Sequence, residues 1–226
     1  MNKTNQEIWE DRYYKGQVLN RYPFDAIVTF VMRNFAKLDR PSVKILDLGS
    51  GGGNHTIFLA KEGFCFYAID YSQSAINHTR NILNNMEVNF GEEQLVCGDF
   101  VNLPFEDNFF DGIIDRQSLD QNKYSNIEKI VGEIYRTLKV GGLYFGINFS
   151  EGDPNSQFGE HLGNNDYSNF TQGTFKGLGH RHFFTQEEVK KLFSNFEMVD
   201  FKVKKVQSIL DESVGSEEYM LTMKKN

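Results

Sequence analysis

A glycine-rich segment with an acidic residue at its start lies between an apolar run and a helical pattern. It reads Asp-Leu-Gly-Ser-Gly-Gly-Gly over residues 47–53. Glycines permit a sharp turn and let a ligand lie against the main chain, and the helix that follows offers unpaired amide donors. The sequence therefore predicts a ligand-binding loop at a strand-to-helix turn. Its predicted contact residues are Asp47, Gly49, Ser50, Gly51 and Gly53.

The spacing within this loop discriminates between two classes of nucleotide cofactor. A dinucleotide loop requires a third glycine at the sixth position of Gly-x-Gly-x-x-Gly, and counting from Gly49 that position holds Asn54. The carboxylate of Asp47 would repel a pyrophosphate, whereas it can help to hold a cationic amino-acid group. The loop therefore favours S-adenosylmethionine over NAD.

Two further acidic residues follow the next two apolar runs. Asp70 ends the second run at a spacing that suits an acceptor for both ribose hydroxyls. Its alternative role is to cap the helix after Ser72. Asp99 follows the third run, where it could accept a bond from an adenine amino group while Phe100 lies against the ring. Its alternative role is that of a turn residue.

The fourth apolar run ends in a polar tetrapeptide. Asp115, Arg116 and Gln117, followed by Ser118, lie where the methionine arm of such a cofactor would pass.

Two histidines, His180 and His182, are the candidate catalytic bases. A hydroxyl group that acts as a nucleophile must lose a proton, and histidine is the side chain whose ordinary pKa suits that task near neutrality. The alternative is a pair that packs or lies at the surface. We predict no metal site, because these loop histidines and His161 lack spaced carboxylates nearby.

Strand-like and helical patterns alternate from residue 43 onward. The alternation predicts an α/β fold: a doubly wound, mainly parallel sheet with helices on both faces. Capping boxes at Ser125-x-x-Glu128 and Thr185-x-x-Glu188 mark two helix starts. The predicted strands are 43–48, 64–69, 94–98, 110–114, 143–149, 198–206 and 218–224, and the predicted helices are 25–36, 54–61, 72–85, 125–138 and 185–195.

The chain of 226 residues suits a single domain, residues 1–226. Residues 1–41 form a helical extension, with an aromatic cluster of Ile8, Trp9, Tyr13 and Tyr14. Residues 150–182 have no periodicity, so they form a long loop. Loops of this length are uncommon in compact domains, and this one is either a loose insertion or a lid over a substrate.

Composition and net charge restrict the kinds of partner that we expect for this chain. Hydrophobic residues make up 39% of the chain and the net charge is −7, with no basic segment that would suggest nucleic-acid binding. No signal peptide or membrane-spanning run is visible, so we expect a cytoplasmic protein without a membrane partner. Cys65 and Cys97 lie in apolar runs and are expected to be buried free thiols. The oligomeric state stays open.

Five motifs in order resemble the class I S-adenosylmethionine-dependent methyltransferases. They lie at 46–53, 68–72, 97–100, 103–112 and 138–142, with Val140 in place of a common proline. The resemblance covers residues 43–149 closely and implies a seven-stranded sheet whose last strand is inserted antiparallel. It also implies S-adenosylmethionine as cofactor and S-adenosylhomocysteine as product. The contacts that it implies are Asp47, Gly49, Gly51, Asp70, Tyr71, Asp99, Phe100 and Asp115.

Two features that the sequence lacks restrict the chemical class of the methyl acceptor. The stretch after the fourth strand lacks the Asn/Asp-Pro-Pro-Tyr/Phe motif of many enzymes that methylate bases or amides, and neither cysteine suits a nucleophile. We therefore expect methyl transfer to an O or N atom of a small-molecule or sugar-type acceptor. The alternatives are a non-catalytic S-adenosylmethionine-binding module that regulates a partner, and an NAD(P)-dependent oxidoreductase.

Overall fold

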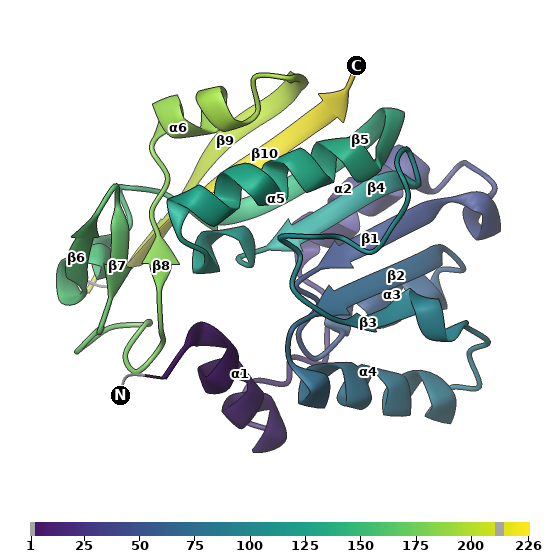
Figure 1. Cartoon of the computed structure of the whole chain (residues 1–226), viewed down its shortest axis with the longest axis horizontal. Coiled ribbons are helices and arrows are strands. Elements are labelled where there is room, and N and C mark those ends of the chain that lie inside the picture. The colour runs from purple at the N-terminus through teal and green to yellow at the C-terminus, as the bar shows by residue number, and fades with distance from the viewer. Residues whose placement is uncertain (1–2, 211–214) are drawn as a thin grey trace.

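The computed structural model of the chain, which describes residues 3–210 and 215–226, is built on a seven-stranded sheet (Figure 1). The strand order is β3-β2-β1-β4-β5-β10-β9. All neighbouring pairs are parallel except those that involve β10, which is antiparallel to both β5 and β9. This confirms the predicted doubly wound sheet with an inserted antiparallel last strand. The strands are β1 Lys44–Leu48, β2 Cys65–Asp70, β3 Leu95–Cys97, β4 Phe110–Arg116, β5 Leu138–Phe149, β9 Phe196–Gln207 and β10 Gly215–Lys225.

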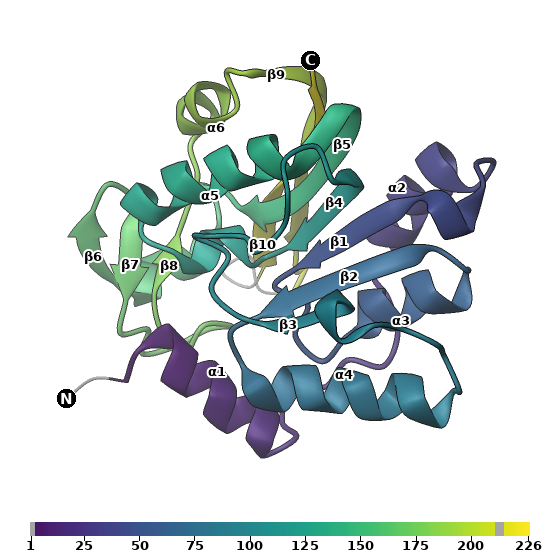
Figure 2. The same ribbon diagram turned by 45° about the vertical axis from the view of Figure 1, so that its right-hand side comes forward.

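Helices cover both faces of this sheet because its central strands are apolar on both sides (Figure 2). One buried core joins the sheet to α2, α3 and α4, and a second joins it to α5 and α6. Because β1, β2 and β4 run parallel to one another, their carboxyl ends lie together at one edge of the sheet. The helices are α1 Asn5–Tyr14, α2 Asp25–Phe35, α3 Asn54–Lys61, α4 Gln73–Asn85, α5 Tyr124–Thr137 and α6 Gln186–Leu192, and short 3-10 turns are η1 Arg40–Ser42, η2 Glu92–Gln94 and η3 Leu119–Gln121.

The two predicted capping boxes have different outcomes. Thr185 caps α6 as predicted, with the Glu188 side chain accepting from the Thr185 amide in return. The prediction at Ser125 is wrong, because α5 begins at Tyr124 and its N-cap residue, Lys123, makes no side-chain cap bond. The helix starts early enough that Ser125 lies inside its first turn.

The segment expected as a long loop contains a second sheet. Residues Glu160–Gly163, Asp166–Ser168 and Arg181–His182 form β6, β7 and β8, after a 3-10 turn η4 at Pro154–Phe158. A cluster of buried aromatic side chains holds this sheet on the end of β5, and the order of its members along the chain has no helical or strand period. Its members are Phe149, Phe170, Phe175 and Phe183. Figure 1 shows this small sheet beside α1.

Three local expectations change in the structure. Trp9 and Tyr13 stack with ring centroids 5.8 Å apart, but Tyr14 is exposed and does not join the aromatic cluster. Cys97 is also exposed, because it ends β3, the edge strand that pairs only with β2. Cys65 is half-buried. None of the helices in the described ranges is sufficiently long and apolar to cross a bilayer.

Candidate functional site

A cavity of about 380 Å³ lies where the parallel strands end. Its walls come from the glycine-rich loop after β1, the ends of β2 and β4, and Phe100 in the turn after β3, and α1 and the small sheet close it. This is the crevice where open α/β sheets bind ligands. The residues used below are Trp9, Tyr13, Phe24, Gly49, Ser50, Gly51, Asn54, His55, Asp70, Tyr71, Phe100, Arg116, Gln117, Ser118, Gln121 and Arg181.

The loop after β1 needs glycine at two of its positions for conformation and space. Gly49 and Gly51 have φ angles of 68° and 52°, a region that favours glycine. A Cβ on Gly49 would overlap the side chain of Ser118, and one on Gly51 would overlap the hydroxyl of Tyr13. The loop therefore presents bare main chain to the cavity.

Asp70, the last residue of β2, is buried on the cavity wall. Its two carboxylate oxygens accept the amides of Gly51 and Ser72 at 2.8 and 2.9 Å. A carboxylate oxygen has more than one lone-pair site, so both oxygens can still accept ligand hydroxyls. Burial raises the pKa of Asp70 to about 6, against the opposing effect of the two amides.

Cofactor affinity should fall at acid pH for this reason. Only the ionised Asp70 offers all its acceptor sites, so the form predicted to bind ribose loses population as the pH drops through about 6. We expect the affinity for S-adenosylhomocysteine, measured by calorimetry, to be highest above pH 7 and to fall below pH 6. The pH dependence should vanish in Asp70→Asn, and an unchanged profile in that variant would contradict the assignment.

Four predicted contact residues do not line the cavity. Asp47, the last but one residue of β1, accepts the amide and hydroxyl of Thr56 and so holds the start of α3. Asp99 is exposed and accepts the amide of Val101. Gly53 has a φ of 80° just before α3.

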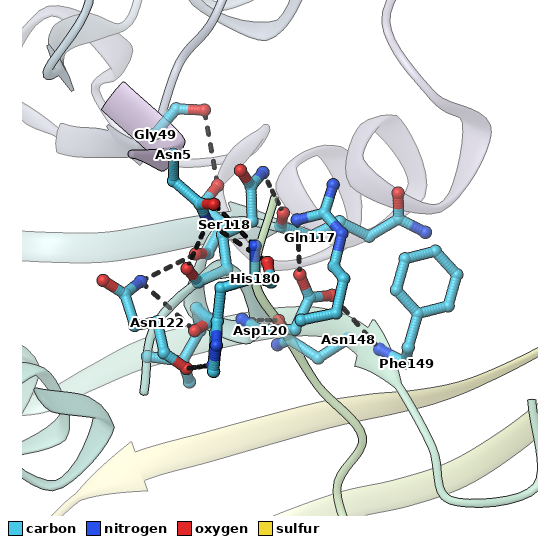
Figure 3. Close-up of polar contacts among 12 residues, drawn as sticks. Asn5, Gly49, Gln117, Ser118, Asp120, Asn122, Asn148, Phe149 and His180 are labelled. Carbon is cyan, nitrogen blue, oxygen red and sulfur yellow. Dashed lines mark hydrogen bonds and ion pairs between the residues drawn. The ribbon is translucent and has the colours of Figure 1, made fainter. Parts of the chain in front are cut away.

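Asp115 is the fourth of these residues, and it organises the turn after β4. Its fully buried carboxylate accepts the amide of Ser118, the hydroxyl of Tyr144 and the side-chain amide of Asn148. The hydroxyl of Ser118 in turn donates to Leu48 at 2.9 Å. Figure 3 shows Ser118 beside Gly49 in this arrangement. Asp115 thus fixes the side chain that packs under the glycine-rich loop.

The end of β4 carries a strained residue and a partly buried cation. Gln117 has a φ of 60°, which is uncommon for a residue with a side chain and often marks a functional site. Its side-chain amide donates to Glu218. The guanidinium of Arg116 lies 3.5 Å from Glu218 and 4.3 Å from the ring centroid of Phe24. Arg116 and Gln117 both line the cavity, and their contact with a cofactor stays a prediction.

The predicted bases His180 and His182 face the small sheet rather than the cavity. Both rings contact Asp166, at 3.2 Å from His180 Nε2 and 2.8 Å from His182 Nδ1. Asp166 accepts from both, and these contacts lower its pKa to about 2 even though burial opposes them. His182 is fully buried. Their role in proton transfer stays a prediction that this geometry does not favour.

Arg181, between the two histidines, reaches the cavity instead. Successive side chains of an extended segment point to opposite sides, and His182 lies opposite Asp166 in the β7–β8 pairing. Sequence reasoning missed Arg181, although this alternation was visible. Arg181 is buried, and its Nη1 lies 3.3 Å from Asp120. Figure 3 shows Asp120 held by Phe149 and near Asn148.

The cavity concentrates polar atoms that have no partner in the protein. Within residues 3–210 and 215–226, six buried side-chain polar atoms make no hydrogen bond, and five of them belong to residues of the cavity wall. Buried polar groups are normally satisfied, so these atoms indicate a polar ligand. They are Ser50 Oγ, His55 Nε2, Tyr71 Oη, Gln121 Oε1 and Arg181 Nε.

Helix α1 covers the cavity, and its residues are half-buried or exposed rather than fully buried. Polar contacts hold it at both ends. Asn5 donates to the carbonyl groups of Gln121 and His180, and Glu10 accepts the hydroxyls of Ser72 and Ser74. A helix held in this way opens at low cost compared with one held by apolar packing.

Replacing Glu10 by alanine should loosen this cover. Loss of the contacts to Ser72 and Ser74 should raise hydrogen exchange in α1 and speed the release of S-adenosylhomocysteine about tenfold. Asp11→Ala is the matched control, since Asp11 pairs with Lys15 on the exposed side of the same helix. Equal release rates in the two variants would show that the Glu10 contacts do not gate the cavity.

Known proteins share this architecture and part of this sequence. Residues 45–142 match the family described as methyltransferase domain. The chain is 32% identical over 108 residues to 24-methylenesterol C-methyltransferase 2 of Arabidopsis thaliana, which covers 46% of this chain and 28% of that protein. It is 32% identical over 121 residues to the demethylmenaquinone methyltransferase of Corynebacterium efficiens, with 52% and 47% covered. The chain thus spans about half or less of these relatives.

Solved structures extend the likeness in fold over nearly the whole chain. A 1,6-didemethyltoxoflavin-N1-methyltransferase of Burkholderia thailandensis, with S-adenosylhomocysteine bound, superposes with a TM-score of 0.71 at 17% identity. The superposition covers 98% of this chain and 87% of that one. An S-adenosylmethionine-dependent methyltransferase of Methanosarcina mazei gives 0.70 at 19% identity, over 90% and 98%.

Proposed function

We propose that this chain, which belongs to the class I S-adenosylmethionine-dependent methyltransferase family, transfers a methyl group to an O or N atom of a small acceptor. The observation that carries the proposal is the cavity wall, where unpaired buried polar atoms gather around a bare glycine-rich loop and a buried carboxylate. Such a wall fits a ligand with hydroxyl, amino and carboxylate groups. S-adenosylmethionine has all three.

Different residues of the cavity wall would contact different parts of the cofactor. Asp70 would accept the ribose hydroxyls, Phe100 would lie against the adenine, and the loop at Gly49–Gly51 would pass beside the amino-acid part. Arg116 and Gln117 would lie near the reacting end. When bound, S-adenosylmethionine supplies a methyl group on a positively charged sulfur, and the protein has to align the acceptor and exclude water.

The predicted contacts outside the wall act indirectly in this proposal. Asp47 holds the start of α3 and Asp115 holds Ser118 beneath the loop, so both shape the site through neighbouring groups. Gly53 permits the turn into α3, and Asp99 orders the turn that carries Phe100. Each is a positioning residue.

A nicotinamide dinucleotide fits this loop poorly. The dinucleotide pattern requires a glycine at position 54. This chain has Asn54 there, and its side chain donates to the carbonyl of Tyr22 at 3.0 Å. Binding of S-adenosylhomocysteine and of NADH, each measured by titration calorimetry, tests the proposal. We expect binding of the first at micromolar concentration and none of the second. Tight NADH binding, or none of S-adenosylhomocysteine, would overturn it.

A regulatory module without catalysis would bind S-adenosylhomocysteine equally well. Transfer of tritium from methyl-labelled S-adenosylmethionine to a panel of small acceptors separates the two functions. We expect labelled product only when acceptor is present, and its absence with every acceptor, including those named below, would favour the module.

A further inference from the structure

We infer that the acceptor is a small carboxylic acid, that Arg181 binds its carboxylate, and that the product is a methyl ester. The inference rests on the proposed function and names the substrate class of the same site. It starts from Arg181, a buried cation on the cavity wall that the cofactor proposal does not use.

The guanidinium of Arg181 is held but not saturated. It has five N–H donors, and in the part of the chain that the structure describes its side chain makes one hydrogen bond, a long one of 3.3 Å from Nη1 to Asp120. Its Nε is buried without a partner. A guanidinium with free donors matches a carboxylate, which can accept two parallel bonds from it.

The surroundings of Arg181 fix its position in advance. Its Cζ lies 5.8 Å from the ring centroid of Trp9 and 5.5 Å from that of Phe175, so aromatic faces flank the cation. Asp120 is itself held by the amide of Phe149. A cation that is already ordered loses little freedom when an anion binds.

Arg181 lies outside the part of the chain that matches the family. The family match ends at residue 142, whereas Arg181 comes from the small sheet and Trp9 from α1. The glycine-rich loop, Asp70 and Phe100 lie inside the match. Function resides in sites added to a shared fold, so we look for the acceptor contact among residues outside the match.

Proton acceptors are scarce beside Arg181. Burial raises the pKa of Tyr13 and of Tyr71, so both hydroxyls stay protonated and act as donors. Asp120 is fully buried in its pair with Arg181 and does not line the cavity. His55 has a free ring nitrogen, but it lies at the start of α3 near Asp47. An alcohol would need a base here, whereas a carboxylic acid is ionised at neutral pH and needs none.

The reaction balances without any further group. A carboxylate oxygen forms a bond to the methyl carbon while the carbon–sulfur bond breaks. The electron pair of the broken bond stays on sulfur, which becomes a neutral thioether. The charges of carboxylate and sulfonium cancel, and no proton moves.

The test uses benzoate, hexanoate and succinate, with benzamide, hexanamide and succinamide as uncharged counterparts. Each is offered to the full chain with methyl-labelled S-adenosylmethionine, and the product is then treated with base. Methyl esters release volatile labelled methanol, while methyl ethers and methylamines do not. We expect volatile label from at least one acid and none from its amide. Label in a base-stable product, or none with any acid while S-adenosylhomocysteine binds, would overturn the inference.

Binding measurements assign the effect to Arg181. Arg181→Gln alone leaves the buried Asp120 unpaired and could misfold, so the double variant Arg181→Gln/Asp120→Asn removes both charges together. In complex with S-adenosylhomocysteine, it should bind the acid at least tenfold more weakly by ligand-observed NMR. Arg33→Gln, on the exposed side of α2, is the control and should bind normally.

Cofactor affinity distinguishes this inference from failure of the proposed function. We expect the double variant to bind S-adenosylhomocysteine within about threefold of the unmodified chain. If it loses that affinity and keeps the acid, Arg181 serves the cofactor and the inference is wrong. If the unmodified chain does not bind S-adenosylhomocysteine, the proposed function itself fails. Dependence of a base-stable product on His55 would instead identify a base-assisted acceptor.

Discussion

Alanine in place of Asp70 is expected to weaken S-adenosylhomocysteine binding at least tenfold. The carboxylate would accept the ribose hydroxyls, and hydrogen bonds to charged groups contribute about 1.5–3 kcal/mol each. Loss of a single such bond exceeds the ~1.4 kcal/mol that corresponds to tenfold in affinity. The substitution also frees the amides of Gly51 and Ser72, so the glycine-rich loop loses one of its supports. Titration calorimetry measures the loss directly.

A matched control separates the ribose contact from general damage to the sheet. Asp111 lies at the other end of the sheet, near the start of β4, and also accepts a backbone amide, that of Lys44 at 2.8 Å. Asp111→Ala should lower the melting temperature and leave the affinity unchanged. If both variants bind S-adenosylhomocysteine like the unmodified chain, Asp70 does not contact the cofactor.

The positions of the strand ends could be predicted from the sequence because they depend on local patterns. Apolar runs followed by glycine or aspartate identified the turns after β1, β2 and β4, and a parallel sheet brings such turns to one edge. Asp70 and Gly51 meet there at 2.8 Å. The order of apolar runs and turns along the chain was enough to predict this edge, because the prediction does not depend on contacts between residues far apart in the sequence.

The direction of each acidic side chain was harder to predict, because one residue of register decides it. Asp70 is the last residue of β2 and faces the cavity, whereas Asp47 is the last but one of β1 and turns to α3. A shift by one residue reverses the face. The sequence shows that both acids lie near strand ends but not where each strand stops.

The small sheet could not be predicted from periodicity. Its core consists of single aromatic side chains from distant positions, such as Phe149, Phe170 and Phe183, which pack together only after the chain has folded. His180 and His182 lie in the segment that reaches the cavity, but their side chains point away from it. Arg181 reaches the cavity because residues 180 and 182 turn toward Asp166.

Alanine at Gly51 is expected to have an effect as large as that of alanine at Asp70, for a steric reason. The φ of 52° costs a residue with a Cβ roughly 1–2 kcal/mol, and the new methyl group would also overlap the hydroxyl of Tyr13. Either the loop or α1 must move, and both are walls of the proposed cofactor site. We expect S-adenosylhomocysteine affinity to fall tenfold or more.

Gly63→Ala is the control that separates backbone strain from the overlap between a Cβ at position 51 and the hydroxyl of Tyr13. Its φ is 80°, yet a Cβ there would meet nothing within 4 Å. Gly63→Ala should therefore lower the melting temperature through backbone strain alone and leave the affinity intact. In the double variant Gly51→Ala/Tyr13→Phe the hydroxyl is absent, and the nearest ring atom would then be 3.2 Å from the new methyl group. Part of the lost affinity should return, because α1 can close again over the loop. If Gly51→Ala and Gly63→Ala bind S-adenosylhomocysteine equally well, the loop at Gly51 does not cradle the cofactor.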